Sequence, residues 1–380
     1  MRTSVLHVCD KFGVAGSSIH GVSRLFSWWF RRFDPARFDV SLVGLKREEP
    51  ASRLLIDEGI AVHHLNRGRF DPRIVSDLVS LARARDARIL HVHGYAAADF
   101  GRLAARRAGA ALVLHEHFAD PRMPAYQGLA DRLLSGLTDR AIAVSGSTRD
   151  FLVRERHVPA ARVRLIWNGA PLEEFATAPP GARESLRAAW GLGPDALAIG
   201  TIGRLSEQKG QRDLLDAAAR VVRSDPRARF VLVGDGDLRP ALEAQARALG
   251  LGDRLLFAGH RTDVPAVLAA LDLVCISSTY EGTPLALFEA MAAGRAIVST
   301  AVDGCREVLE DGRTALLTPP RDPAALATAL DRVLADDVLR GRLGAAASIE
   351  SRRYDIAECV RQIEALYDEV LAERARGAAA

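Results

Sequence analysis

The feature that most constrains the fold of this chain is an alternation, repeated twice, of short β-branched runs with longer Ala-, Leu- and Arg-rich stretches. This alternation is typical of a parallel sheet flanked by helices. It is interrupted after Pro171 by the segment Thr-Ala-Pro-Pro-Gly at 177–181, a composition typical of a linker. We therefore predict an α/β protein with two doubly wound domains in series. The expected strands are 4–9, 38–44, 61–65, 88–93, 111–116, 141–145, 162–167, 197–202, 229–234, 254–258, 272–277, 296–300 and 315–318.

Composition excludes several classes of protein. The 380 residues are 48% hydrophobic and 26% charged, which is the balance of a globular chain. No uncharged apolar run reaches the length of a membrane span. The N-terminus leads directly into the first expected strand, so we expect cytoplasmic residence. The four cysteines form no Cys-x-x-Cys pair, which argues against a structural zinc site or a disulfide framework.

Charge is distributed unevenly along the chain. Residues 1–170 contain 26 Lys and Arg against 17 Asp and Glu, a net charge of +9, although the whole chain has only +3. A basic first half favours an anionic substrate, nucleic acid or a membrane surface as partner. We expect no nucleic acid, because the basic residues are dispersed and no aromatic-basic RNA motif is present. In the expected helix 21–33, the line of Arg24, Trp28 and Arg31 fits either a membrane interface or a solvated basic face.

A glycine-rich basic turn follows the expected strand 197–202. It reads Gly203-Arg204-Leu-Ser-Glu-Gln-Lys209-Gly210. Ligands of doubly wound sheets bind at the carboxyl ends of strands, and a helix that begins near Gln211 would direct N–H groups to the same place. Arg204 can donate two parallel hydrogen bonds to phosphate oxygens, and Lys209 supplies a point charge. The turn therefore predicts an anion site, although a solvated turn with two surface cations has the same sequence.

A second polar segment follows the expected strand 272–277. It reads Glu281-Gly282-Thr283-Pro284-Leu285-Ala-Leu-Phe-Glu289. We expect Glu289 inside a helix and partly buried among apolar neighbours, which is costly unless its carboxylate is bonded. Sugar and ribose hydroxyls are suitable donors. The alternative is an acidic helix start at Glu281 and a surface residue at Glu289.

Together these segments resemble glycosyltransferase family 4, a class of retaining, nucleotide-sugar-dependent enzymes of GT-B fold. The resemblance covers nearly the whole chain and includes four further motifs. These are Ile166-Trp-Asn-Gly-Ala170, Val233-Gly-Asp-Gly236, Ala290-Met-Ala-Ala-Gly294 and Asp303-Gly-Cys-Arg-Glu307. It implies two facing Rossmann-like domains with a central cleft. Residues 1–170 would bind the acceptor and 182–354 the donor, and a C-terminal helix at 355–376 would complete the first domain.

The resemblance also implies roles for individual residues of the second half. Arg204 and Lys209, after Gly203, would hold the donor diphosphate and offset charge on the departing nucleotide, as catalytic residues with Glu281. Glu281 would lie beside the transferred sugar, and Glu289 would accept hydrogen bonds from the ribose. The segment Gly282, Thr283, Pro284 and Leu285 would line the donor site, where all but the proline offer an N–H group. Arg261 would lie near the base, unless it is an ordinary surface arginine.

In the first half, the resemblance implies an active-site histidine and a diphosphate loop. His117 in Leu114-His-Glu-His117 matches the family histidine, and the nearby His115 is the alternative. The loop that begins at Gly13 offers Gly16 and Ser17 in place of the family's glycine pair. His20-Gly21 fits that position equally well.

The family is metal-independent, so we expect no cofactor and no metal. Asp235-Gly-Asp237 has the Asp-x-Asp pattern that other glycosyltransferases use for a metal, but it fits a tight turn after a strand better. The expected activity is hexosyl transfer from a nucleotide sugar, UDP- or GDP-linked, to a glycan, lipid-linked or small-molecule hydroxyl in polysaccharide or glycoconjugate biosynthesis. Peripheral contact with the inner face of the membrane would follow from a lipid-linked acceptor. The alternatives are a nucleotide-sugar epimerase of the same fold and a non-catalytic module that binds a glycan or a partner.

Overall fold

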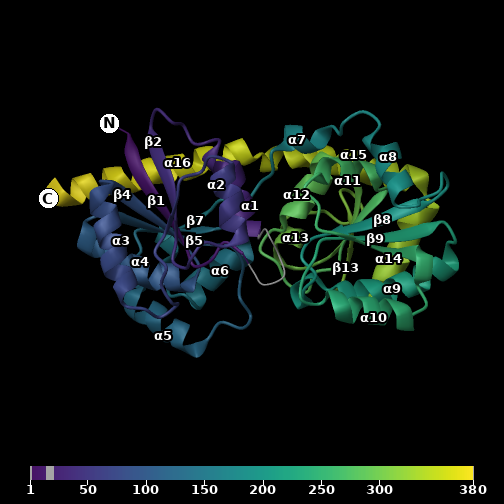
Figure 1. The fold of residues 1–380 in the computed structure, drawn as a ribbon, viewed down its shortest axis with the longest axis horizontal. Helices are drawn as coiled ribbons and strands as arrows, with labels where there is room; N and C mark the ends of the chain where they lie inside the picture. Colours follow the sequence, from purple (N-terminus) through teal and green to yellow (C-terminus); the bar gives the residue numbers. More distant parts are fainter. Residues whose placement is uncertain (1, 14–20, 380) are drawn as a thin grey trace. The chain divides into compact units, whose positions relative to one another are not determined.

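The computed structural model describes residues 2–13 and 21–379, which form two compact units (Figure 1). Unit 1 contains the described residues up to Asn168 together with the C-terminal helix that begins at Ile356. Unit 2 contains Gly169–Asp355. Within the described residues, the chain passes into unit 2 after Asn168 and returns to unit 1 for its last helix.

Unit 1 is built on a parallel sheet of seven strands. Their order is β3-β2-β1-β4-β5-β6-β7, so the first strand lies inside the sheet and the chain winds outward from it in both directions. The strands are β1 Thr3–Cys9, β2 Phe38–Gly44, β3 Val62–His64, β4 Ala87–His93, β5 Ala111–Glu116, β6 Arg140–Ala143 and β7 Val163–Leu165.

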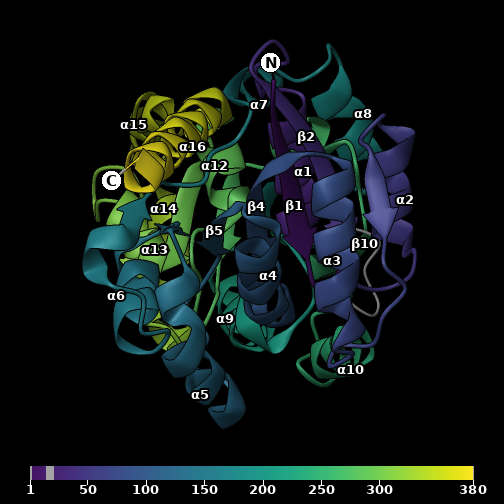
Figure 2. The same cartoon turned by 90° about the vertical axis from the view of Figure 1, so that its left-hand side faces the viewer.

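Helices cover both faces of this sheet. Helices α3 and α4 pack against each other and against β4, as Figure 2 shows, whereas α16 packs against α1 and β5 on the opposite face. The helices of unit 1 are α1 Gly21–Phe30, α2 Pro50–Asp57, α3 Arg73–Ala84, α4 Tyr95–Ala108, α5 Ala125–Leu134, α6 Gly146–Arg154 and α16 Ile356–Ala379, with short 3₁₀ turns η1 Ser135–Leu137 and η2 Ala160–Arg162.

Unit 2 has a parallel sheet of six strands in the order β10-β9-β8-β11-β12-β13. Its strands are β8 Leu197–Ile202, β9 Ala228–Val233, β10 Leu255–Gly259, β11 Leu273–Ile276, β12 Ala296–Thr300 and β13 Leu316–Thr318. Its helices are α7 Leu172–Ala176, α8 Ala182–Ala189, α9 Gln211–Ser224, α10 Arg239–Ala248, α11 Val264–Ala270, α12 Leu285–Ala292, α13 Asp303–Val308, α14 Pro323–Ala335 and α15 Asp337–Ser351, with the 3₁₀ turns η3 Glu207–Lys209, η4 Gly252–Arg254 and η5 Arg352–Tyr354.

The α/β class and all thirteen expected strands are confirmed, because each β-branched run forms a strand with bounds within a few residues of the prediction. The linker is in a different place. Residues 177–181 lie inside unit 2 as the loop between α7 and α8, and the chain passes between units at Asn168 and Gly169. The short helix α7 packs against α11 and α12, so it belongs to the second unit although it precedes the Pro-Pro-Gly segment.

Helix α16 buries one face on unit 1. Val360, Ile363, Leu366, Tyr367 and Val370 are each at most 2% exposed, at the 3.6-residue spacing that the sequence shows. Charged contacts add to this packing, since Arg37 forms a salt bridge with Glu364, and Arg140 with Glu369. Among the described residues, no helix is both long and apolar enough to span a bilayer.

Candidate functional site

Two predicted segments meet at the carboxyl edge of the unit 2 sheet. Strand β8 lies between β9 and β11, where the winding of the sheet reverses direction, and such a switch point is where open α/β sheets bind ligands. The loop after β11 bonds to the loop after β8, because the Thr279 N–H donates to the Gln208 carbonyl at 2.8 Å. The Ser277 hydroxyl also donates to the Lys209 carbonyl at 2.8 Å.

Glycines permit this close approach of loops. Gly210 has φ of 61°, and a Cβ atom there would lie 2.0 Å from the Ser277 carbonyl oxygen. At Gly304, the first turn of α13, a Cβ atom would lie 1.6 Å from the carbonyl oxygen of Gly282. Real side chains do not tolerate such distances, so both glycines are required for the loops to pack as they do.

Glu281 is the centre of a buried polar cluster. Its carboxylate accepts from the Lys209 ammonium at 2.5 Å, the Ser278 hydroxyl at 2.7 Å and the Gln208 amide at 3.2 Å. The residue is 5% exposed, so its orientation is fixed by these donors. The sequence predicted Lys209 and Glu281 but not their pairing, and it did not identify Gln208 or Ser278. Gln208 lies inside the first motif and Ser278 three residues before the second, and this closeness in sequence was the available signal.

The other predicted donor-site residues surround this cluster. Within the described part of the chain, the Arg204 guanidinium has no carboxylate partner, whereas its main chain is held by Gln211, whose amide donates to the Arg204 carbonyl at 2.9 Å. Gly203 precedes it with φ of 153°. Glu289 lies in α12 and is 1% exposed, as the sequence predicts.

The amino end of α12 completes this edge of the sheet. Pro284 is the residue before the helix, and Thr283 is buried. Of the three N–H groups named from the sequence, that of Leu285 lies in the first turn of α12, where a helix lacks internal acceptors, and those of Gly282 and Thr283 lie in the loop before it.

Arg261 and the Asp-x-Asp triplet lie apart from the Lys209–Glu281 pair. Arg261 follows β10, two strands from β8, and its guanidinium binds both oxygens of Asp263. Asp235 accepts from the Gly236 N–H at 2.8 Å and pairs with Arg239 at 3.2 Å, which is the tight turn that the sequence predicts. Asp237 is exposed.

The corresponding edge of unit 1 is filled by histidines. His117 follows β5 and is half-buried, whereas His115 in the strand is 1% exposed and its ring stacks on that of His117 at 4.5 Å between centroids. Of the two alternatives, His117 is therefore the one nearer the surface. His93 bonds to it, with 3.0 Å between His93 Nδ1 and His117 Nε2.

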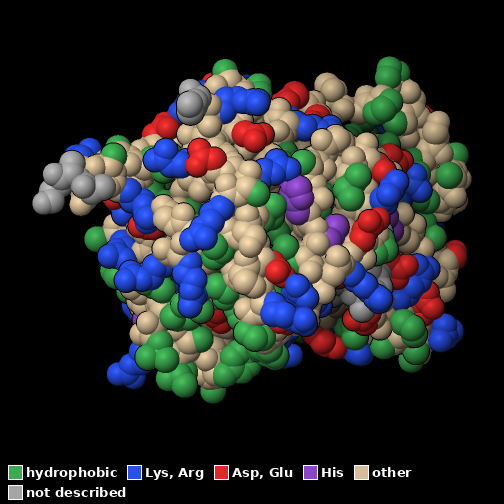
Figure 3. All heavy atoms as spheres, turned by 60° about the vertical axis from the view of Figure 1, so that its left-hand side comes forward, with side chains coloured by type: hydrophobic (Ala, Val, Ile, Leu, Met, Phe, Trp, Pro, Cys, Tyr) green, Lys and Arg blue, Asp and Glu red, His purple; other side chains and the backbone are tan. Residues whose placement is uncertain are grey.

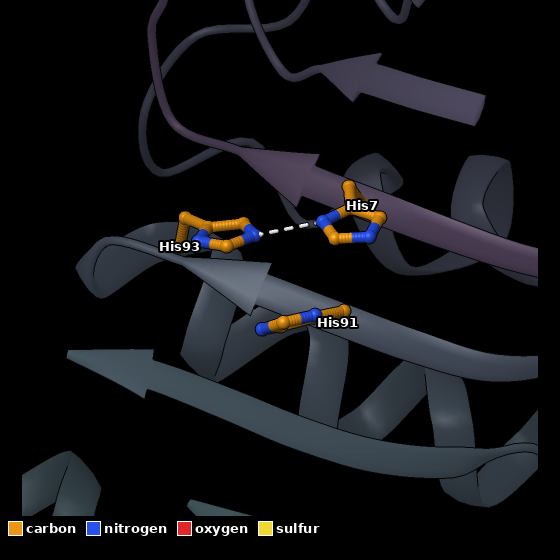
Figure 4. A group of neighbouring side chains, drawn as sticks. All are labelled: His7, His91 and His93. Carbon is orange, nitrogen blue, oxygen red and sulfur yellow. Dashed lines mark hydrogen bonds between the residues drawn. The ribbon is translucent and has the colours of Figure 1, made fainter. Parts of the chain in front are cut away.

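These rings belong to a longer chain of hydrogen bonds that the sequence did not reveal. His93 bonds to His7 at 3.1 Å (Figure 4), and the Tyr367 hydroxyl from α16 joins His7 at 3.1 Å and His91 at 2.6 Å. His91 bonds in turn to His115 at 3.1 Å. The residues come from β1, β4, β5 and the C-terminal helix, so their meeting depends on tertiary structure.

Burial keeps the imidazoles of His7, His91, His93 and His115 uncharged. Desolvation lowers the pKa of His7 to about 3 and the pKa values of His91, His93 and His115 well below the ordinary value, and the mutual repulsion of the rings lowers the last three further. A neutral imidazole has one donor and one acceptor nitrogen, which matches the two hydrogen-bond partners of His7, His91 and His93. The four buried imidazoles are therefore polar without charge, whereas Glu116 at the end of β5 forms an ion pair with Arg156.

Two sets of histidines bring ligand atoms close enough to hold a metal ion. His7, His91 and His93 form one set and His93, His115 and His117 the other, with the nitrogens of each within 4.8 Å. In the structure one pair in each set is hydrogen-bonded, His7 with His93 and His93 with His117. The rings of His115 and His117 are nearly parallel, at 10°, so their lone pairs do not converge on one point.

Two predictions for the N-terminal segment have different outcomes. Trp28 does not extend an exposed basic line, because it is 7% exposed and the Arg24 guanidinium lies over its ring at 5.1 Å. The prediction was wrong for the exposure of Trp28, since burial of the indole against the unit outweighs its polar N–H, whereas membrane contact itself stays a prediction. Gly16 and Ser17 lie outside the described residues.

Comparison with known proteins agrees with this geometry. Residues 19–174 match the family model described as Glycosyltransferase Family 4, and residues 196–336 match the model of Glycosyl transferases group 1. A phosphatidyl-myo-inositol mannosyltransferase of Mycobacterium tuberculosis is 31% identical over 82% of this chain and 81% of that enzyme. The chain therefore belongs to glycosyltransferase family 4.

Other relatives differ in coverage. An α-D-kanosaminyltransferase of Streptomyces kanamyceticus is 32% identical, but the match spans 62% of this chain and only 59% of that enzyme. The fold is that of Anabaena HepE, solved in complex with UDP, with a TM-score of 0.84, 24% identity and coverage of 97% of this chain and 100% of that one. The two-domain GT-B fold and the glycosyltransferase class are confirmed, and neither the epimerase nor the non-catalytic module is favoured.

Proposed function

We propose that the chain is a retaining, metal-independent hexosyltransferase that moves a sugar from a UDP- or GDP-sugar to an acceptor hydroxyl. The observation that carries the proposal is the cluster at the carboxyl edge of β8 and β11. It includes the Arg204 guanidinium, which has no carboxylate partner among the described residues, the Lys209–Glu281 pair and the amino end of α12. The structure of HepE was solved with UDP, which supports a uridine nucleotide as the first candidate.

In the proposed reaction, the bond between the sugar and the diphosphate breaks while the acceptor oxygen bonds to the same sugar carbon. The hydroxyl proton passes to the departing phosphate, so no protein nucleophile is needed. Arg204 and Lys209 offset the charge that develops on the diphosphate, an effect of about 3–4 kcal/mol for a well-placed donor. Lys209 also neutralises Glu281, which would otherwise repel the phosphates.

The remaining residues have positioning roles in this proposal. Glu289 accepts from the ribose hydroxyls, and Glu281 with the N–H groups of the 282–285 segment orients the transferred sugar. His117 would contact the sugar and Arg261 the base, and the diphosphate role of Gly16 and Ser17 stays a prediction from the sequence. Unit 1 would bind the acceptor and unit 2 the donor.

The acceptor is proposed to be lipid-linked. The mannosyltransferase relative is named for phosphatidyl-myo-inositol, which is a lipid. The +9 charge of residues 1–170 suits an acceptor or a surface that carries phosphate.

The test is release of nucleotide from a panel of UDP- and GDP-sugars, with and without polyprenyl phosphate, polyprenyl diphosphate-sugar and phosphatidylinositol acceptors. We expect one donor to release its nucleoside diphosphate in an acceptor-dependent manner, with the anomeric configuration of the donor retained in the product by NMR. Conversion of the sugar without nucleotide release would instead support the epimerase, and inversion would refute the retaining mechanism.

A further inference from the structure

Helix α5 of unit 1 is arranged with its polar side chains inward. Tyr126, Leu129 and Leu133 recur along one face and are 45%, 61% and 74% exposed, whereas Gln127 and Asp131 are fully buried. A surface helix ordinarily buries its apolar stripe and exposes its charges. Helix α5 instead exposes apolar side chains to water and buries a carboxylate, so contact of its outer face with water is energetically unfavourable.

A buried network of ion pairs holds the helix in this orientation. Asp131 accepts from Arg102 at 2.5 Å and from Arg156 at 2.5 Å, and all three side chains are fully buried. Gln127 donates to Asp99 at 3.0 Å in α4. Rotation of the helix to bury its leucines would break these bonds and leave the buried Arg102 and Arg156 with only Asp99 and Glu116 as partners. The outward direction of the leucines is therefore fixed by the fold.

The apolar face extends beyond the helix and has a basic margin. Phe70 is 68% exposed and packs edge-on against Tyr126 at 5.7 Å, and the Arg69 guanidinium lies over both rings at 5.4 and 5.9 Å. Arg69, Arg122 and Arg132 are exposed around this face. In Figure 3, hydrophobic side chains gather along the lower edge of the molecule, where α5 lies in Figures 1 and 2.

We infer that this face, made of Phe70, Tyr126, Leu129 and Leu133 with its three arginines, docks on a lipid bilayer that contains anionic lipid. Aromatic and leucine side chains enter the interface while arginines remain at the phosphate level, which is the arrangement that peripheral helices use. The inference rests on the proposed function in one respect, because a lipid-linked acceptor would require the enzyme to work at such a surface. It replaces Arg24, Trp28 and Arg31 as the expected contact.

The experiment is co-sedimentation of the full chain with vesicles of phosphatidylcholine and phosphatidylglycerol in equal parts. We expect the wild-type chain to bind and the double variant Leu129→Gln/Leu133→Gln to bind about a hundredfold more weakly, since two leucines no longer leave water. Arg69→Gln should weaken binding about fivefold and reduce its sensitivity to salt. Vesicles of phosphatidylcholine alone should bind the wild type more weakly than mixed vesicles.

The matched control is Val338→Gln/Ile349→Gln in α15. These side chains are 80% and 65% exposed, comparable to the two leucines, but they lie in unit 2. We expect the control to bind vesicles like the wild type. Equal loss of binding in both double variants, or no binding by the wild type, would overturn the inference.

Two further readouts separate the other outcomes. A dimer in sedimentation velocity without vesicles, absent in the leucine variant, would assign the face to a second copy of the chain and refute the membrane. Nucleotide-induced thermal shift should be the same in the leucine variant and the wild type. Vesicle binding without any nucleotide response would leave the docking surface standing and refute the proposed transferase.

Discussion

The two sheets end in opposite chemistry at the same structural position. At the carboxyl edge of β1, β4 and β5, buried imidazoles bond to one another and to Tyr367 without charge. At the edge of β8 and β11, glycine loops carry Arg204 and the Lys209–Glu281 pair. The comparison shows that one fold type offers an edge dominated by neutral imidazoles beside the Arg156–Glu116 ion pair, suited to hydroxyl groups, and an edge with Arg204 and Lys209, suited to a diphosphate. The side chains at the strand ends determine which of these two chemistries a sheet edge has.

The largest expected effect is at the charged edge. Lys209→Met should lower turnover about a thousandfold, because it removes a cation from the diphosphate and leaves Glu281 uncompensated beside it. Steady-state kinetics with the donor identified by nucleotide release would measure this. Glu281→Gln in the same chain should restore part of the donor affinity, since the repulsive charge is gone. Turnover like that of the wild type in Lys209→Met would show that the charged edge does not hold the donor.

The neutral edge should respond differently. His117→Gln should lower kcat about tenfold to a hundredfold through loss of sugar positioning, with nucleotide affinity unchanged because the charged edge is intact. The exposed His157 of the same unit provides the control, and His157→Asn should leave kcat and KM as they are. A drop in nucleotide affinity in His117→Gln, measured by calorimetry, would contradict the separation of the two edges.

The pH dependence of stability should distinguish the units. His7 has a folded pKa of about 3 against about 6.5 unfolded, so the unfolded state binds more protons between these values. Its contribution is fully present above about pH 6.5 and is lost as the pH falls toward 3, by about 2 kcal/mol near pH 5. Hydrogen exchange, corrected for intrinsic rates, should show β1 and β4 losing protection at pH 5 while β8 and β11 keep theirs. Equal loss in both units would contradict this assignment.

The smallest expected effect is that of a chelator. Arg204 and Lys209 supply the positive charge at the donor edge, and Asp235 is bonded to Arg239. Activity should therefore be unchanged after dialysis against EDTA. Loss of activity that Mg²⁺ or Mn²⁺ restores would give Asp235 and Asp237 a metal-binding role.

The sequence predicted what depends on local pattern. The strands follow from β-branched runs, and Lys209, Glu281 and Glu289 follow from motifs on loops at strand ends. The buried face of α16 follows from the spacing of Val360, Ile363 and Tyr367. Each of these features is encoded within a few residues.

The sequence could not predict what depends on distant residues. Tyr367 meets His7 and His91 across more than 270 positions, and no spacing rule connects them. Trp28 was expected to be exposed because either face of its helix could have packed on the sheet. In the structure the face with Trp28 is buried. The reversed orientation of α5 depends on Arg102 in α4 and Arg156 in the loop after α6, which donate to its Asp131.

The central claim is that the charged edge of unit 2 binds a nucleoside diphosphate. The most direct test is the thermal shift of wild type and Lys209→Met with UDP, GDP, ADP, CMP and dTDP. A ligand at about a hundred times its Kd stabilises by about 2.7 kcal/mol, enough to raise the Tm visibly. We predict a clear shift with one nucleoside diphosphate, UDP being the first candidate, which Lys209→Met abolishes. No shift with any nucleotide, or an equal shift in both proteins, would contradict the account.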